Sequence, residues 1–384
     1  MTMNNTIRYI ITWLLYGNED AARQVGYTDD EEEAHQYKVN IRPSGHWGRE
    51  IVLPELKNPT LEGNEVTVDI VYNTFFFISR AEELINSERD EHGRFLAKYS
   101  ILGQKNRMMI PLLDEYARFL MKALELPLPK PGYGHIYLTH DIDSIDQYRH
   151  LRGAIGGLVR GEWRQVLASW RDIHNDPVYT FPWLMEQDDK VRRSEEGEKV
   201  EVIYFAKHTH GRGYDYPQYN RHGFTFRRLC KSLKRMGATI GIHSSYYGFK
   251  GHTDHQYHRS HYLRCSIDNM EHLLLGSGIT DDFTMGFADV AGFRLQTTRA
   301  VRWINPKTWT LTDLTLHPLT VMDCTLYNPH YMGLDEDEAY FYCQRLFEKI
   351  KQNGGDLCIL WHNSNPTQNP IHFPLYEKIL QLID

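Results

Sequence analysis

Two aspartates close together in the sequence, Asp141 and Asp143, follow the apolar run His135–Leu138. In an extended chain, residues two apart point the same way, so both carboxylates can reach one site. Two carboxylates that close repel each other unless a cation lies between them or one holds a proton. A metal explains the pair, with one carboxylate as its ligand and the other as a base acting on water. The alternative is an Asx turn that caps the next helix.

Histidines occupy comparable positions after two other apolar runs. His243 follows Ala238–Ile242, and His362 follows Leu357–Trp361. Neutral imidazole binds zinc and related ions, so His243 is a candidate ligand, although a hydrogen-bonded structural histidine is the alternative. The usual pKa range of histidine makes His362 a candidate acid. Together with the aspartate pair, these positions predict one catalytic centre.

The intervening segments must place these residues on a common edge. Val200–Phe205, Ala238–Ile242 and Leu357–Trp361 are predicted strands, whereas Phe226–Arg235 and Asp335–Ile350 have helical spacing. Repeated strand–helix units predict a parallel sheet or barrel. In that architecture the chemistry lies at the carboxyl ends of the strands.

A proline-rich segment, Leu126–Gly132, divides the chain into two predicted domains, 1–130 and 131–384. Three prolines in five residues cannot continue a helix. The first domain has a mixed α+β pattern and no catalytic constellation. Its predicted elements are the strands Ile51–Leu53 and Val66–Tyr72 and the helices Phe75–Leu84 and Ile110–Leu124.

Composition narrows the class of protein. Hydrophobic residues make up 41% and aromatic residues 12%, as in globular chains with a large core. The net charge of −7 does not favour nucleic acid as a partner. The five cysteines are widely spaced, which argues against a disulfide framework. The apolar run Tyr9–Tyr16 is too short for a membrane span or signal peptide, so we expect a cytoplasmic protein. The oligomeric state stays open.

The order and spacing of these residues resemble the polysaccharide deacetylases, carbohydrate esterase family four in the broad sense. The likeness is greatest to a bacterial branch with an extra N-terminal domain of unknown function. The family's motifs match Asp141 and Asp143, His243-Ser244, Arg259 ahead of a short loop, and Leu360-x-His362. Segments of the same branch resemble Tyr72–Phe77, Asp90–Arg94, Asp282–Gly286 and Gly292–Arg294.

This resemblance implies a distorted (β/α) barrel after an N-terminal α+β domain. It also implies a metal-dependent hydrolase that removes acetyl groups, as linear amides or esters, from a carbohydrate. Asp141 would be the catalytic base and Arg259 would pair with it, while His362 would protonate the leaving group. Asp143 and His243 would bind a divalent metal, which we expect to be zinc.

One position departs from the family's pattern. The second motif usually ends in another histidine four residues after the first, and here that position is Tyr247. We expect His261, in the loop after Arg259, to supply the third ligand. The alternative is weak or lost metal binding, which would make the chain a non-catalytic carbohydrate-binding protein on a degenerate scaffold. A hydrolase of a different bond is a third possibility, because a fold does not fix a substrate.

Several polar segments are candidates for substrate contact. His252, His255, His258 and His261 recur every third residue, which could give a separate metal site but is more typical of a polar lid over a sugar cleft. The segment His208–Tyr216 could bind sugar or be an ordinary surface loop. Arg294, Arg299 and Arg302 could bind phosphate or an acidic sugar, or form structural ion pairs. The expected substrate-binding residues are Tyr247, Tyr262, Asp282, Arg294 and Trp361.

Overall fold

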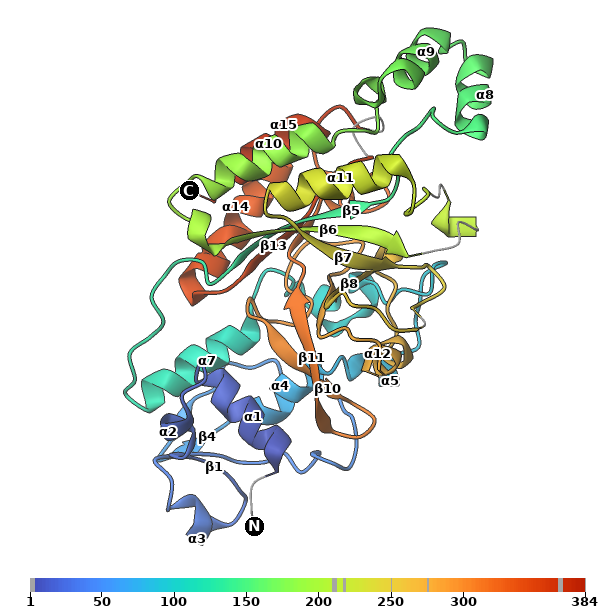
Figure 1. Cartoon of the computed structure of the whole chain (residues 1–384). Coiled ribbons are helices and arrows are strands. Elements are labelled where there is room, and N and C mark those ends of the chain that lie inside the picture. Colours follow the sequence, from blue (N-terminus) through green and yellow to red (C-terminus); the bar gives the residue numbers. More distant parts are fainter. Residues whose placement is uncertain are drawn as a thin grey trace.

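The computed structural model describes residues 4–208, 213–216, 219–249, 251–274, 276–364 and 369–383. Within these ranges a large sheet and a small sheet organise the chain (Figure 1). The large sheet has the order β10-β11-β9-β8-β7-β6-β5-β13-β12. Its strands are β5 Ile136–Ile142, β6 Val200–His208, β7 Thr239–Ser244, β8 Tyr257–Ser260, β9 Asp281–Met285, β10 Val301–Asn305, β11 Thr310–Pro318, β12 Val321–Met322 and β13 Leu357–Leu360.

The neighbouring strands of this sheet run parallel from β11 to β12, and β10 pairs antiparallel with β11. The strands predicted at His135–Leu138, Val200–Phe205, Ala238–Ile242 and Leu357–Trp361 are confirmed as β5, β6, β7 and β13. Their carboxyl ends therefore share one edge, as parallel pairing requires. The α/β class and the common edge are confirmed.

The large sheet curls strongly, so that strands far apart in its order meet across its inner face. Tyr137 on β5 and Phe283 on β9 have ring centroids 5.2 Å apart, although three strands separate them. His317 on β11 stacks on Phe283 at 4.2 Å. These buried rings fill the concave side, and the result is an α/β half-barrel with an apolar interior.

Helices cover the outer face of β5, β6 and β13. They are α10 Phe181–Arg192, α11 Phe224–Arg235, α14 Glu336–Asn353 and α15 His372–Leu380. Local sequence sets the ends of α14: the Asp335 and Glu338 side chains form a capping box, and Gly354 ends the helix at a φ of 60°. The helices predicted at Phe226–Arg235 and Asp335–Ile350 are confirmed.

The N-terminal part contains the small sheet, of order β1-β2-β4-β3, and several helices. The strand predicted at Ile51–Leu53 is absent. The segment precedes Pro54, lies at the surface and has no strand partner among the described residues. The strand predicted at Val66–Tyr72 ends at Val66, and a helix begins at Ile70. The elements are α1 Asn5–Leu14, α2 Glu19–Ala22, β1 Val25–Tyr27, α3 Glu31–Ala34, β2 Val39–Ile41, β3 Leu61–Glu62, β4 Glu65–Val66, α4 Ile70–Ile78, α5 Glu82–Ile85, η1 Ala97–Tyr99, α6 Ile101–Gln104 and α7 Leu112–Ala123.

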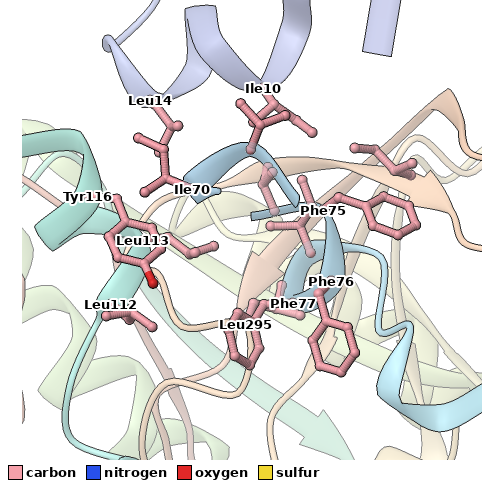
Figure 2. Packing of buried hydrophobic residues seen from close by; sticks show 14 of the residues in the cluster. Ile10, Leu14, Ile70, Phe75, Phe76, Phe77, Leu112, Leu113, Tyr116 and Leu295 are labelled. Atoms are coloured by element: carbon pink, nitrogen blue, oxygen red, sulfur yellow. The ribbon is translucent and has the colours of Figure 1, made fainter. Parts of the chain in front are cut away.

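The N-terminal helices share a hydrophobic core with the far end of the large sheet. Figure 2 shows side chains of α1, α4 and α7 in one cluster that also contains Leu295, which belongs to the C-terminal part. The same buried cluster includes Trp303 on β10 and Leu314 on β11. Asp114 on α7 accepts a hydrogen bond from Arg299 Nε at 2.9 Å. The two parts of the chain are therefore joined by packing as well as by sequence.

A helical hairpin projects from the body of the molecule after β5. It consists of α8 Leu151–Val159 and α9 Trp163–Arg171 (Figure 1). The remaining described elements are η2 Ile173–Asn175, η3 Gly197–Lys199, η4 Gly213–Asp215, η5 His261–Leu263, α12 Ile267–Leu274 and α13 Asp323–Tyr327. All five cysteines are free thiols. Over the described ranges, the structure contains no helix with the length and apolar character needed to cross a membrane.

Candidate functional site

The carboxylates of Asp141 and Asp143 lie at the carboxyl end of β5. Asp141 is buried, and its Oδ2 lies 3.6 Å from Nε2 of His243. Asp143 is partly exposed, and its Oδ1 lies 3.6 Å from the same nitrogen. The period of two along an extended chain therefore brings both aspartates to one centre, as the sequence predicts.

His243 is fixed at the end of β7 by a backbone contact. Its ring Nδ1 lies 3.1 Å from the carbonyl oxygen of Arg259, which accepts a hydrogen bond from it. Nε2 is then the nitrogen with a free lone pair, and it faces the two aspartates. Burial lowers the pKa of His243 to about 4, so the ring is neutral at pH 7, as a metal ligand must be.

His261 follows β8 and is oriented by Asp215, from η4. His261 Nδ1 and Asp215 Oδ1 are 3.0 Å apart. His261 Nε2 lies 3.4 Å from Oδ1 of Asp143. Burial lowers the pKa of His261, but its contacts with Asp143 and Asp215 outweigh burial and raise it. A carboxylate on the far ring nitrogen is the usual way in which a metal-binding histidine is held.

Asp143, His243 and His261 together could hold a metal ion. One ligand atom from each lies within 4.8 Å of the others. Zinc binds such ligands at about 2.0–2.2 Å, which places neighbouring ligand atoms about 3.3 Å apart in a tetrahedral site. Asp143 Oδ1 and His243 Nε2 are buried without a hydrogen-bond partner among the described residues. A cation satisfies both atoms, so these residues fit a metal.

Lys207, at the end of β6, supplies a positive charge to the same centre. Its Nζ lies 3.5 Å from Oδ1 of Asp143 and is almost fully buried. Burial raises the pKa of Asp143, but Lys207 and His261 outweigh burial and hold it well below its usual range. Lys207 therefore helps to keep Asp143 ionised.

Arg259 crosses the concave side of the sheet behind the two aspartates. Its guanidinium is fully buried, and Nη1 donates to Asp141 Oδ1 at 3.1 Å and to Thr139 Oγ1 at 2.8 Å. Nε donates to the carbonyl of Phe283 at 3.0 Å. These bonds fix the carboxylate of Asp141 so that Oδ2 faces the centre. A buried charge of this kind is tolerated because it is paired and hydrogen-bonded.

His362 lies on the opposite side of the aspartates, after β13. Its Nε2 is 3.9 Å from Asp141 Oδ2 and from Asp143 Oδ2. Its Nδ1 is 2.7 Å from Oδ1 of Asp323, whose Oδ2 also accepts from the His362 backbone N–H. Burial lowers the pKa of His362, but the charge of Asp323 and the hydrogen bond outweigh it and raise that pKa to about 9.

A second group of possible metal ligands lies around His362. Asp323, Cys324 and His362 offer ligand atoms within 4.8 Å of one another. Here, however, the polar atoms bind each other, since both oxygens of Asp323 accept from His362. Burial raises the pKa of the Cys324 thiol well above its usual value, which disfavours the thiolate that a metal requires.

A cavity of about 540 Å³ opens beside the aspartates. The catalytic candidates Asp141, Asp143, His261 and His362 lie in its wall. Arg94, from the N-terminal part, also lines it and is held by Asp90 Oδ2 at 2.7 Å and by the hydroxyl of Tyr331 at 2.9 Å. The N-terminal part therefore contributes a cation to the wall of this cavity.

The five expected substrate-binding residues lie in different places. Tyr262 lines the cavity, at a left-handed φ of 61°. Tyr247 is exposed and outside the cavity wall. Asp282 is buried against His258, with Oδ2 2.6 Å from its Nδ1. Arg294 is buried and pairs with Glu83 at 2.8 Å, while Trp361 stacks on Tyr376 in the outer core at 4.8 Å.

The histidine run does not form one cluster. His252 is exposed, His255 Nδ1 contacts the carbonyl of Ile240, and His258 is buried with Asp282, so His261 alone reaches the centre. Residues 209–212, which include His210, lie outside the described residues, whereas Tyr214 and Tyr216 of the same segment line the cavity. Arg299 pairs with Asp114 and Arg302 with Asp313, in agreement with structural ion pairs.

Four residues of the centre receive no individual role from the sequence reasoning: Lys207, Asp215, Asp323 and Arg94. Lys207 follows an apolar strand, and that strand-end position is a signal that could have identified it. Asp215 and Asp323 act on histidines far away in the sequence, and their own segments have no periodic pattern. Arg94 lies in a turn of the N-terminal part, where no local feature indicates a cavity.

Comparisons with known proteins give one match. Residues 4–129 match a family described only as a family of unknown function (DUF7033). No curated protein and no solved structure matches the chain. The match ends within the proline-rich segment Leu126–Gly132, and the residues of the candidate centre lie beyond it, apart from Arg94.

Proposed function

We propose that the protein is a metal-dependent hydrolase that removes acetyl groups from an acetylated carbohydrate. The observation that carries this proposal is a pair of buried atoms without a hydrogen-bond partner among the described residues, Asp143 Oδ1 and His243 Nε2, beside the carboxylate of Asp141. The resemblance of the motifs to polysaccharide deacetylases supports it. On this proposal the curled sheet corresponds to the family's distorted barrel.

Asp143, His243 and His261 would hold the ion, which we propose to be zinc. A divalent ion held by these residues would supply Lewis-acid chemistry: it would polarise the acetyl carbonyl and make water a stronger nucleophile at neutral pH. Two imidazoles and one carboxylate are a common ligand set for zinc in hydrolases. The contact between His261 and Asp215 would fix the ring that replaces the histidine expected at position 247.

Asp141 would act as the general base. Arg259 engages Oδ1, which leaves Oδ2 directed at the centre and able to accept a proton from water. The buried guanidinium stabilises the ionised carboxylate before the proton moves. A base within reach of the attacking water contributes typically 10²–10⁴-fold to such reactions.

His362 would donate a proton to the departing amine or alkoxide. Asp323 binds Nδ1, so Nε2 is the atom that faces the aspartates and the cavity. The atoms of base and acid, Asp141 Oδ2 and His362 Nε2, then lie 3.9 Å apart at the same centre. This arrangement suits cleavage of an amide or an ester, since both need a proton taken from water and another given to the leaving group.

The cavity supports a sugar as the substrate. Tyr214, Tyr216, Tyr262 and Tyr331 line its wall, and aromatic rings with hydroxyl groups suit sugar faces and their hydroxyls. Arg94 adds a donor that could bind a ring substituent. On the expectation of a cytoplasmic location, the substrate would be a glycan precursor rather than a finished polymer.

The second candidate is a non-catalytic carbohydrate-binding protein. Lys207 is the observation that favours it, because its ammonium lies 3.5 Å from Asp143 and can neutralise that carboxylate without a metal. The combination of Asp141, Arg259 and His362 favours the enzyme, since binding alone needs neither a base nor an acid.

The decisive experiment measures acetate release from soluble N-acetylglucosamine oligosaccharides by the zinc-loaded protein. We expect turnover that a chelator abolishes and that Asp141→Asn lowers by about 10²–10⁴-fold while its zinc content is unchanged. Asp254→Asn, a change at a fully exposed aspartate, is the matched control and should keep full activity.

The same variants separate the two candidates. An enzyme loses turnover in Asp141→Asn, whereas a binding protein shows no acetate release at all and keeps its oligosaccharide affinity in that variant. Absence of zinc binding in the wild type, even in excess zinc, would refute the metal-dependent hydrolase.

A further inference from the structure

Exposed apolar side chains gather on the hairpin formed by α8 and α9. Val159 is 82% exposed, Leu151 77% and Leu167 62%. Four more large apolar side chains of the hairpin are each more than half exposed: Ile155, Leu158, Trp163 and Trp170. Apolar patches of this kind on a protein surface mark interaction sites.

The spacing of these residues gives each helix one outward apolar face. In α8 they stand at positions 151, 155, 158 and 159, and in α9 at positions 163, 167 and 170. This is the spacing of residues that face a core. The opposite faces pack on each other at Gly157 and Val166, where a Cβ on the glycine would lie 2.7 Å from the valine side chain. The two helices therefore pack on each other, and their outer apolar faces have no partner among the described residues.

The hairpin carries a positive charge, unlike the rest of the chain. Residues 149–172 contain five arginines and two acidic residues, within a chain of net charge −7. Arg171 and Arg164 stand on α9 next to Trp170 and Trp163. Tryptophan and arginine beside exposed leucine and valine are the composition of helices that lie in a membrane interface.

We propose that this hairpin docks the protein on an anionic lipid surface. The apolar faces would enter the headgroup region, and the arginines would bind the acidic headgroups. A second copy of the chain is a poorer occupant, because a symmetric dimer places each patch against its own copy and brings like charges together.

The position of the hairpin links this surface to the proposed function. His150, directly before α8, and Val178, after α9, both line the cavity. Arg152 lies over the ring of Tyr216, another residue of the cavity wall, at 4.9 Å. Docking would bring the cavity close to the headgroups. Resting on the proposed function, the substrate class is therefore an acetylated glycan linked to a lipid.

The docking surface is tested by flotation of the full chain with vesicles of phosphatidylglycerol and phosphatidylcholine. We expect binding that falls with salt, that is lost on pure phosphatidylcholine, and that drops at least about tenfold in Leu151→Gln/Val159→Gln/Leu167→Gln. The matched control is Leu53→Gln/Phe224→Gln/Phe341→Gln, at three exposed apolar residues outside the hairpin, and this variant should bind as the wild type does. Unchanged melting temperatures establish that both variants fold.

Several outcomes would overturn the docking proposal. These are no binding to acidic vesicles, an equal loss in the control variant, or a concentration-dependent dimer that the hairpin variant abolishes. The last outcome would assign the face to a second copy of the chain.

Acetate release separates this proposal from the proposed function. On a soluble oligosaccharide the hairpin variant should match the wild type, and on the same oligosaccharide linked to a lipid in acidic vesicles it should be slower by about tenfold. Equal rates on both substrates refute the lipid-linked substrate and leave the hydrolase standing. Vesicle binding without any acetate release refutes the hydrolase and leaves the docking surface standing.

Discussion

Two groups of similar side chains adjoin the same cavity, each with two residues in its wall, and differ in what surrounds them. Asp143, His243 and His261 form the first group, and Asp323, Cys324 and His362 form the second. The first keeps two buried atoms without a hydrogen-bond partner among the described residues, whereas the oxygens of Asp323 accept from His362. Burying a polar atom without a hydrogen bond costs about 1–3 kcal/mol, so the first group can gain from binding a cation, whereas the hydrogen bonds of the second are already made.

This difference shows that the partners of a side chain, more than its type, decide its role. His243 and His261 donate from Nδ1 to a carbonyl and a carboxylate, and both leave Nε2 facing Asp143. His362 is held in the same way, but its Nε2 lies 3.9 Å from the aspartates, farther than the other two rings. It can serve as an acid beside a metal site without being part of it.

Removing a ligand of the first group should have the largest effect. In His243→Ala we expect the zinc content to fall from about one ion per chain to almost none, because a site with two protein ligands binds weakly. Elemental analysis after dialysis measures the ratio. Retention of zinc in this variant would contradict the assignment of the first group.

Asp215 should matter less, because it acts through His261. Asp215→Asn removes the carboxylate that orients the ring, and loss of such a partner typically lowers metal affinity about 10–100-fold. Competition with a chromogenic chelator gives the zinc affinity. Full affinity in the Asn variant would mean that His261 is not a ligand, whereas Asp254→Asn controls for the loss of one negative charge.

Asp323 should act on stability in acid. Burial raises its pKa, but His362 and His372 outweigh burial and lower it to about 2 from a usual 3.8. A lowered carboxyl pKa stabilises the fold fully above pH 3.8, and this contribution is lost as the pH falls through 2. It amounts to about 2 kcal/mol.

The free energy of unfolding should therefore depend on pH differently in Asp323→Asn and in the wild type when the solution is acidic. We expect the free-energy gap between metal-free wild type and Asp323→Asn to shrink as the pH falls from 4 to about 2. Urea unfolding at several pH values measures it. A gap that stays constant over this range would show that the carboxylate is not stabilised by its neighbours.

Cys324 should have the smallest effect. Cys324→Ser keeps the size of the side chain and removes the thiol, and we expect unchanged zinc content and unchanged acetate release. Cys324 supplies the only sulfur of the second group. A fall in zinc content in this variant would therefore show that the metal binds to the second group and not to the first. Isothermal titration with zinc is the direct measurement.

The strands that build the candidate site follow from simple sequence patterns. The strands ending at Ile142, Ser244 and Leu360 are apolar runs, and polar residues at their carboxyl ends mark one edge. His261 is predicted differently, because the resemblance to the deacetylases places the loop after Arg259 near the centre. These inferences work because each rests on residues that are neighbours in the sequence.

The features of the site that the sequence does not predict depend on contacts between distant segments. Trp361 and His362 are adjacent, yet residues one apart point to opposite faces, so His362 reaches the cavity while Trp361 packs on Tyr376. Asp215 and His261 meet across 46 residues of chain. No pattern in one segment reveals such a pairing.

The core shared by the two parts of the chain limits how freely evolution can recombine them. Asp114 in the N-terminal part accepts hydrogen bonds from Thr297, Thr298 and Arg299, and Trp13 donates to the carbonyl of Ala300. A recombination event that joined residues 4–129 of one ancestor to the remainder of another would bring together two surfaces that are not complementary in this core. The two parts should therefore be inherited together. Substitutions on one side of the core should be accompanied by compensating substitutions on the other side.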